Sequence, residues 1–510
     1  MLVFILGLSL LLVGYVTWGR LIASTVKPDP ARPTPAVTKA DGIDFVAMPA
    51  WRVALVQLLN IAGLGPVFGP IMGALWGPQV FLWIVFGTIL GGAVHDFLAG
   101  AMSVRAGGAG LPALIGHHLG RPARIVATGF ILILLLLVGT VFVKGPAMLI
   151  VNLAPPDQLA GLIGADSARF FDQSFHGQSA WLWIVMLAIF AYYILATMLP
   201  IDAVIGRFYP LLALALLVMV GGLAASILSG RLELAAFTLS NLHPTGAVAW
   251  PTIFITVSCG AVSGFHATQS PLMARCLPNE RFMKPVFYGA MVAEGVIALV
   301  WASAAQGYYG GVAALQAVLA DGGPGRVVHE ICTANLGHAG GILAVLGVIV
   351  LPITSGDTAF RVSRLIVADA IGLSQQKLRH RFAIAVPLFT LSLALNFIDF
   401  TIIWRYFGWA NQTLAAVALW TGAVFLARRG TMWWMAAAPA TFMTIVTTTY
   451  ILVEKHGLGL PYRLGVGLGI ALGLAAAAAF WLFKPAPKPD DDLPTATPNE
   501  AERAADRLAC

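Results

Sequence analysis

The chain has 510 residues, of which 59% are hydrophobic and only 10% are charged, whereas about a quarter of a soluble globular protein is charged. Even a large soluble domain buries only about three quarters of the surface that its unfolded chain exposes. The composition therefore excludes a soluble enzyme and a disordered chain, and lipid must surround most of the protein. The four cysteines form no C-x-x-C pair, so neither a disulfide scaffold nor a metal site is indicated.

Thirteen segments are long and apolar enough to cross a bilayer, which takes about 20 residues. We expect an all-α polytopic membrane protein with spanning helices near residues 2–19, 51–76, 79–104, 125–151, 181–199, 207–228, 251–275, 286–308, 342–366, 383–400, 402–427, 432–453 and 464–483. No basic residue precedes the first segment and no A-x-A site follows it. The first segment is therefore predicted to be a retained helix rather than a cleaved signal peptide.

The positive charges predict the orientation of these segments. The loops that follow the odd-numbered segments, together with the C-terminal tail, carry 23 of the 30 Lys and Arg residues, and the opposite face carries the other 7. Because cytoplasmic loops hold the excess of Lys and Arg, we expect the N-terminus outside and the C-terminus in the cytoplasm of a bacterial inner membrane. The formal net charge of +7 then indicates contact with anionic membrane lipid, and no nucleic-acid partner is expected.

Two of the segments carry glycine and proline residues that should interrupt a helix. Segment 51–76 contains LNIAGLGPVFGPIMGALW, and segment 251–275 contains FITVSCGAVSGFHATQSPL. Non-helical backbone at membrane depth is tolerated only where it is buried in protein or lines a cavity. The two segments are the second and the seventh, and such corresponding breaks in inverted repeats indicate a transporter binding site. The alternative is that both are continuous, glycine-packed helices with small kinks.

These observations predict five parts in the chain. They are an N-terminal helix with a cytoplasmic linker, a first five-helix repeat, a second inverted five-helix repeat, two C-terminal helices and a mobile cytoplasmic tail, at residues 1–50, 51–228, 251–427, 428–483 and 484–510.

Four long motifs resemble the carbon starvation protein A family. They are GPVFGPIMGALWGPQVFLWIVFGTILGGAVHDF, which begins at Gly65, CGAVSGFHATQSP at 259–271, TSGDTAFRVSRL at 354–365 and FGWANQTLAA at 407–416. The resemblance extends over about residues 50–425. It implies an inner-membrane secondary transporter that takes up peptides or, in one branch, pyruvate with protons. It also implies the five-plus-five inverted repeat of the amino acid–polyamine–organocation superfamily.

The second broken segment crowds polar side chains into backbone that we expect to be unwound. Free backbone amides and the N-terminus of a half-helix would attract the carboxylate that pyruvate and peptides share, and His266 could add a proton-dependent donor. Alternatively, the hydroxyl groups only satisfy the carbonyls freed by the break. The predicted substrate-binding residues are Gly63, Gly65, Gly260, Ser263, His266, Thr268, Gln269 and Asn411.

Titratable side chains at mid-membrane cost several kcal/mol, roughly 2.5–3.5 on insertion scales, and are functional candidates by default. We identify five of them: His95, Asp96, His266, Glu294 and Asp357. Asp96 can carry a proton or bind an ion, with His95 as its modulator. Either could instead be a structural anchor that holds Arg105 or a backbone amide. Lys144 is expected only to extend toward the membrane surface.

Asp96, Asp357, Thr354 and Ser355 are the predicted ion-coupling residues. By resemblance to sodium-coupled proteins of the proposed fold, Thr354 and Ser355 would face the first break and bind Na⁺ through oxygen ligands. Asp357 could instead titrate with H⁺, or form a structural pair with Arg361 one turn away. The coupling ion is therefore H⁺ or Na⁺, and no cofactor is expected.

Taken together, the sequence predicts cation-coupled, alternating-access import of a small carboxylate-bearing nutrient. The two alternative functions are those of an intramembrane enzyme and of a passive channel. HEICT at 329–333 lacks the second His of a zinc-binding H-E-x-x-H, and GAVSG at 260–264 is not a G-x-S-x-G nucleophile elbow. A channel filter usually requires oligomeric symmetry, which nothing in the sequence indicates.

Overall fold

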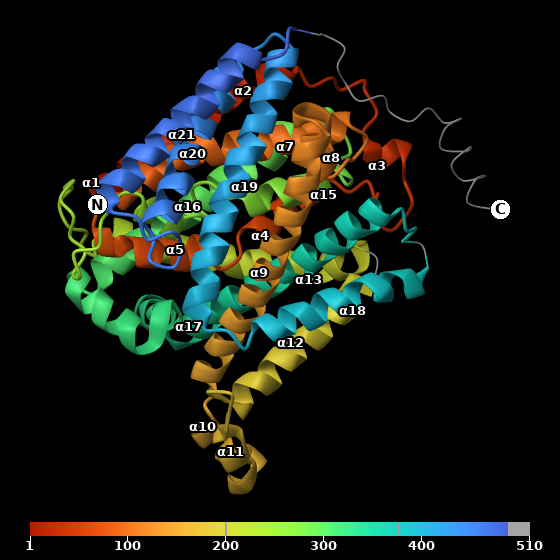
Figure 1. Ribbon diagram of the computed structural model, residues 1–510. Helices are drawn as coiled ribbons and strands as arrows, with labels where there is room; N and C mark the ends of the chain where they lie inside the picture. The colour runs from red at the N-terminus through yellow and green to blue at the C-terminus, as the bar shows by residue number, and fades with distance from the viewer. Residues whose placement is uncertain (199–200, 376, 488–510) are drawn as a thin grey trace.

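The computed structural model describes residues 1–198, 201–375 and 377–487 of the chain. Within these ranges the protein is almost entirely helical, and the strands are a single antiparallel hairpin, β1 (Ser174–Phe175) with β2 (Gln178–Ser179). The polypeptide forms one helical bundle, and a small lobe at the end of α9 projects from it (Figure 1). Most of the predicted tail, at residues 488–510, lies outside the described residues.

The first half of the chain contains both continuous and interrupted helices. In chain order they are α1 (Leu2–Val16), α2 (Trp18–Val26), α3 (Pro35–Thr38), α4 (Ala50–Ile61), α5 (Gly65–Gly73), η1 (Ala74–Trp76), α6 (Val80–Leu82), η2 (Trp83–Gly92), α7 (Ala93–Arg105), α8 (Leu111–Leu119), α9 (Arg121–Leu153), α10 (Pro156–Ile163), α11 (Ala165–Asp172), α12 (Ala180–Met198) and α13 (Ile201–Leu228).

The second half has the same character and ends in two long helices that pack side by side (Figure 1). Its elements are α14 (Thr252–Thr256), α15 (Gly264–Ala274), η3 (Glu280–Phe282), η4 (Lys284–Tyr288), α16 (Gly289–Tyr308), α17 (Val312–Ile371), α18 (Leu378–Leu395), α19 (Phe400–Arg428), α20 (Trp434–Val453) and α21 (Tyr462–Phe483).

All thirteen predicted segments are helical. Nine helices of the described chain are long and apolar enough to cross a membrane, and ten if α4 and α5 form one bent span. Two shorter apolar helices, Ala180–Ala196 and Ala213–Leu228, and the broken α14–α15 segment account for the other predicted spans. The protein is therefore a multi-pass, all-α membrane protein, whereas the count of thirteen spans and the inverted repeat stay predictions.

Two features of the helices were not predicted. The segment η2, which leads into α7, is a π-helix, and a second π-helical turn, η4, leads into α16. Such turns are rare and often mark functional sites. Helix α17 begins far earlier than the predicted segment and is kinked at Gly323 and Gly337, whose positive φ angles of 67° and 71° are readily adopted by glycine.

The centre of the bundle is formed by the two broken segments together with α7 and α16. Helices α5, α7 and α15 consist largely of buried residues and α4 is half buried, whereas α21 has only three buried residues, Gly465, Gly469 and Gly473. These glycines allow α21 to pack closely on α20, because a methyl group at any of them would overlap an α20 side chain. Helices α5, α7 and α15 are therefore enclosed by the surrounding helices.

The predicted cytoplasmic linker is ordered and covers the ends of the central helices. The Thr34 hydroxyl donates to the Leu277 carbonyl at 2.6 Å, and the Met48 amide donates to the Cys276 carbonyl at 3.2 Å. Beneath it, Arg105 at the end of α7 pairs with the buried carboxylate of Glu280 at 2.7 Å. Arg105 also donates to the Lys27 carbonyl at the start of the linker at 3.1 Å, so the linker joins the ends of α7 and α15.

Lys144 differs from the expectation that it extends to the membrane surface. Its side chain is buried, and its ammonium donates to the carbonyls of Asn396 at 3.1 Å and Ile398 at 3.0 Å. These carbonyls lie in the turn between α18 and α19, and the Asn396 carbonyl also accepts from the Gln178 amide at 3.1 Å. Lys144 therefore connects α9 to this turn.

Candidate functional site

The two broken segments are interrupted where the sequence predicts, and the breaks contact each other. Helix α4 ends at Ile61 and α5 begins at Gly65, with a bend of 48° between them. Pro66 favours this restart, because its missing N–H and fixed φ suit the first turn of a helix. In the second segment, α14 ends at Thr256 and α15 begins only at Gly264.

Glycine is what allows the breaks to approach so closely. A Cβ atom at Gly65 would lie 2.1 Å from the Cβ atom of Cys259, and one at Gly69 would lie 2.9 Å from the Thr256 carbonyl oxygen. Gly260 has a φ of +88° and packs against Pro66 of the first break. Two regions nearly 200 residues apart thus form one region of irregular, buried backbone, as a binding site at membrane depth requires.

The start of α15 is held by the predicted residues Ser263 and Asn411. The Asn411 side-chain oxygen, from α19, accepts hydrogen bonds from the Phe265 amide at 2.7 Å and the Ser263 hydroxyl at 3.2 Å. Asn411 Nδ2 in turn lies 3.0 Å from Ser263 Oγ and 3.5 Å from the sulfur of Cys259. A single amide side chain therefore caps the half-helix that was expected to attract a carboxylate.

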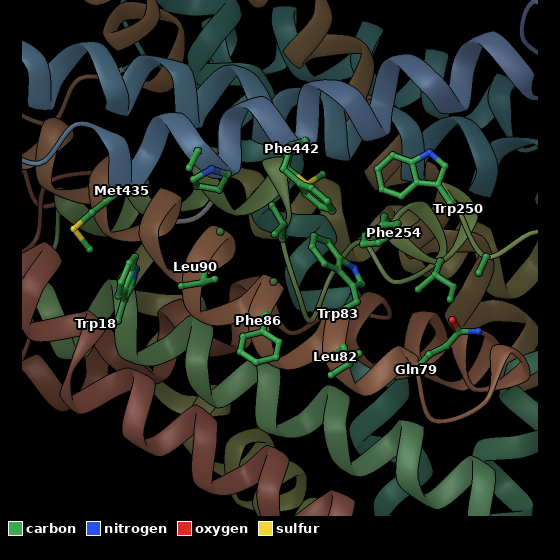
Figure 2. A pocket seen from close by; sticks show the side chains of 18 of the residues that line it. Trp18, Gln79, Leu82, Trp83, Phe86, Leu90, Trp250, Phe254, Met435 and Phe442 are labelled. Atoms are coloured by element: carbon green, nitrogen blue, oxygen red, sulfur yellow. The ribbon is translucent and has the colours of Figure 1, made fainter. Parts of the chain in front are cut away.

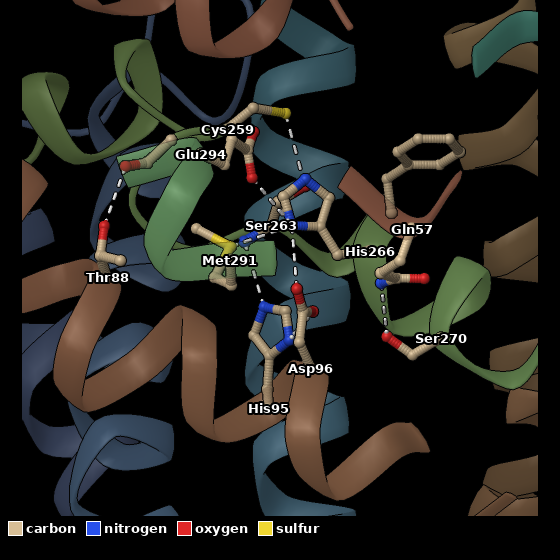
Figure 3. Close-up of polar contacts among 12 residues, drawn as sticks. Gln57, Thr88, His95, Asp96, Cys259, Ser263, His266, Ser270, Met291 and Glu294 are labelled. Atoms are coloured by element: carbon tan, nitrogen blue, oxygen red, sulfur yellow. Dashed lines mark hydrogen bonds and ion pairs between the residues drawn. The ribbon is translucent and has the colours of Figure 1, made fainter. Parts of the chain in front are cut away.

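Four titratable side chains meet beside the second break (Figure 3). His95 Nδ1 lies 2.7 Å from one carboxylate oxygen of Asp96, and His266 Nδ1 lies 3.4 Å from the other. The same nitrogen of His266 lies 3.4 Å from Glu294 Oε2. These residues come from α7, α15 and α16, and all four are fully or almost fully buried. We call them the buried cluster.

Hydrogen bonding decides the tautomer of one histidine. The backbone amide of Ser263 donates to His95 Nε2 at 3.1 Å, and because an amide can only donate, this nitrogen carries no proton. The proton of neutral His95 is then on Nδ1, which faces Asp96. His95 thus has the anchoring role that the sequence left open, since it joins a backbone amide of the break to the carboxylate.

The buried cluster also contacts both breaks. The Ile61 carbonyl, at the end of α4, interacts with the imidazole of His266, and the Gly260 amide interacts with the carboxylate of Glu294. Thr88 of η2 donates to the Gly260 carbonyl at 3.0 Å. The buried cluster and Thr88 therefore contact the irregular backbone of both breaks.

The other predicted residues lie around this centre. The Ser355 hydroxyl donates to the Leu59 carbonyl at 3.1 Å, and Ser355 Oγ would lie 3.3 Å from a Cβ atom at Gly63, so it faces the first break. Thr354 and Thr268 instead donate to carbonyls of their own helices at 2.7 Å and 2.6 Å. Gln269 donates to the Thr268 hydroxyl at 3.1 Å.

Asp357 lies apart from the buried cluster, although it is also fully buried on α17. It is close enough to Tyr192 and Arg364 to interact with them electrostatically. Arg361, one of the partners that the sequence offers for it, lies 3.8 Å from Asp44 in the segment between α3 and α4 and donates to the Ala196 carbonyl at 2.8 Å. The two predicted ion-coupling aspartates thus occupy separate environments.

Three contact residues were not recognised from the sequence: Thr88, Cys259 and Met291. Met291 places its sulfur 3.3 Å from His266 Nδ1, and Cys259 lies 3.4 Å from Ser263 Oγ. The only sequence signal for Cys259 is its place in the CGAVSG run, whereas Thr88 and Met291 occur in apolar helices without a motif. In the part of the chain that the structure describes, no group of three or more His, Cys, Asp or Glu residues is arranged to hold a metal ion.

A separate cavity borders the second break (Figure 2). Its volume is about 760 Å³, and its walls are apolar side chains of η2, α14 and α20 with Trp18 and Trp250 among them. Val262 of the break and Gly91 line it as well. The cavity contains none of the predicted site residues, so it is distinct from the buried cluster.

Interrupted helices at membrane depth that enclose titratable groups define the class of multi-pass membrane transporters. Within that class, the chain belongs to the carbon starvation protein CstA family, whose model matches residues 1–155, 162–321 and 310–450. The chain is 43% identical over 355 residues to an uncharacterized membrane protein of Haemophilus influenzae. The aligned region covers 63% of this chain and 95% of that protein.

Two relatives with named functions are more distant. A peptide transporter CstA of Campylobacter jejuni is 27% identical, over 89% of this chain and 79% of the relative. The pyruvate/proton symporter BtsT of Escherichia coli is 29% identical, over 58% of this chain and 47% of the relative. Both of these relatives are transporters, which supports a transport function for this chain.

Proposed function

We propose that this protein imports a small carboxylate-bearing nutrient, pyruvate or a short peptide, across the bacterial inner membrane by cation-coupled alternating access. Its N-terminus would lie outside and its C-terminus in the cytoplasm, as the distribution of Lys and Arg favours. The names of the relatives support the substrate class, because they are peptide transporters and a pyruvate/proton symporter.

The observation that carries the proposal is the meeting of the two breaks at the buried cluster. Irregular backbone inside a membrane leaves polar groups that a passenger can bind. At the start of α15, Asn411 Oδ1 accepts from the Phe265 amide and the Ser263 hydroxyl. These two donors also suit a carboxylate, so Asn411 holds the place that a substrate carboxylate would take.

The proposed substrate site therefore comprises Gly63, Gly65 and Gly260, which shape the backbone, and Ser263, His266, Thr268, Gln269 and Asn411, which supply polar groups. Coupling is assigned to the buried cluster that contains Asp96, and the proton symport of one relative favours H⁺ as the coupling ion. Asp357, with Thr354 and Ser355 on the same helix, is the second candidate for the coupling group, and Ser355 faces the first break.

The decisive experiment measures uptake of labelled pyruvate and labelled dipeptides into proteoliposomes under imposed proton and sodium gradients. We expect an inward proton gradient to drive accumulation of at least one of these solutes above its external concentration. Flux that ignores both gradients would contradict coupling. Normal accumulation by an Asp96→Asn or Asp357→Asn variant would remove that residue from the coupling role.

A further inference from the structure

We propose that Glu294 carries the coupling proton, and that only its protonated form admits an anionic passenger to the break between α14 and α15. One proton and one monocarboxylate would then cross together without net charge movement. This inference rests on the proposed function and deepens it, because it names the coupling group and the charge balance of transport.

Glu294 is the least paired member of the buried cluster. Its side chain is fully buried on α16, and the titratable groups that face it are Asp96 from α7, His266 from α15 and Cys259 from the second break. Asp96 has two imidazoles at its oxygens, at 2.7 and 3.4 Å, whereas Glu294 has one at 3.4 Å.

The hydrogens available in the cluster cannot satisfy two ionised acids. His95 has one proton, on Nδ1, and that nitrogen faces Asp96. His266 Nδ1 is equally distant from Asp96 and Glu294, and a single N–H cannot donate well to both. A proton on Glu294 resolves this, because both imidazoles then serve the Asp96 carboxylate and Glu294 is neutral. A buried second negative charge would be costly.

The position of Glu294 links this proton to the passenger. Its carboxyl group interacts with the Gly260 amide, at the break where a carboxylate is expected to bind. An ionised Glu294 would repel a carboxylate there and would compete for the amide, whereas a protonated Glu294 would do neither. Proton and monocarboxylate therefore each raise the affinity for the other, as symport requires.

The step itself is a simple proton transfer. External water delivers H⁺ to the Glu294 carboxylate, which becomes a carboxylic acid, and the passenger then binds as an anion. When the site opens to the cytoplasm, the acid returns the proton to water and the passenger leaves. No other bond forms or breaks.

Transport in proteoliposomes tests this, with pyruvate as the probe. We expect a proton gradient alone to accumulate pyruvate by about tenfold for each pH unit, and a membrane potential alone, set with valinomycin and potassium, to accumulate none. Glu294→Gln should keep exchange of internal for external pyruvate but lose all accumulation. Glu233→Gln, which changes an exposed glutamate in the loop after α13, should behave like the unmodified protein. Proton-driven accumulation by Glu294→Gln would overturn the inference.

Infrared spectroscopy of the purified protein tests the protonated acid without any transport. We expect a carboxylic-acid carbonyl band at neutral pH that disappears in Glu294→Gln and persists in Glu233→Gln. Absence of that difference would refute Glu294 as the proton carrier, whatever the substrate proves to be. If the band behaves as expected and neither pyruvate nor dipeptides are transported, the substrate assignment fails instead.

Discussion

Replacing Gly264 by alanine tests the packing that holds the second break. Gly264 is the first residue of α15 and lies against the backbone of α19. A Cβ atom here would lie 2.4 Å from the Asn411 carbonyl oxygen and 2.6 Å from the Ala415 amide nitrogen. Both are main-chain atoms, so no side-chain rotation can relieve the overlap.

The size of the effect follows from these distances. Restoring an ordinary contact of about 3.5 Å requires the two helices to separate by about 1 Å. The hydrogen bond from the Phe265 amide to Asn411, now 2.7 Å long, would then exceed the usual limit. Overpacking costs about 1–3 kcal/mol and the lost hydrogen bond about 0.5–1.5 kcal/mol. We therefore expect Gly264→Ala to lose roughly 1.5–4.5 kcal/mol of stability.

The assay compares apparent melting midpoints of the purified protein in detergent at one scan rate, because membrane proteins often unfold irreversibly. Gly129→Ala is the matched control, since Gly129 lies within α9 and a Cβ atom there meets no atom within 4 Å. Alanine is the better helix former, so the control should melt at the same temperature as the unmodified protein or slightly above it. Equal midpoints for the two variants would refute the close approach of α15 to α19.

Glu280→Gln removes the carboxylate that pairs with Arg105 and should lower the free energy of unfolding by about 3–5 kcal/mol, because breaking a buried ion pair is strongly destabilising. Thermal unfolding measures this loss of stability. A melting midpoint equal to that of Glu233→Gln would contradict the prediction. His243, in the loop before α14, packs against Trp76 with the ring planes tilted and the centroids 4.5 Å apart, and burial lowers its pKa below the usual 6.5. Below pH 6.5 the unfolded chain binds a proton that the folded imidazole resists, so stability should fall as the pH decreases through this window. His243→Phe should flatten that pH dependence, and an unchanged slope would show that another group is responsible.

Much of the fold could be predicted from the sequence because apolar length is a local property. Each of the thirteen predicted segments is helical, and the breaks fall at residues 62–64 and near Gly260, where glycine and proline disfavour a continuous helix. The short connection between the segments at 383–400 and 402–427 is a real turn between α18 and α19. The π-helical turns before α7 and α16 have no comparable local signal and were missed.

The candidate site could be predicted only in part. The sequence marks His95, Asp96, His266, Glu294 and Asp357 as costly titratable groups in lipid, but it does not say which of them meet. Adjacent residues on a helix point about 100° apart, and His95 and Asp96 nevertheless contact each other within the buried cluster. Asp357 has the same apparent cost and lies elsewhere, beside Tyr192 and Arg364.

The sequence by itself determined that this protein is a membrane protein. It also determined the positions of the helices and of the two helix breaks, because hydrophobicity and backbone preference are properties of each segment alone. Only the tertiary structure decided that Glu294 faces His266, that His95 is held in one tautomer by the Ser263 amide, and that Asn411 caps α15. These contacts join residues up to 168 positions apart. They depend on how whole helices pack, and helix packing is set by the fit of all their side chains together.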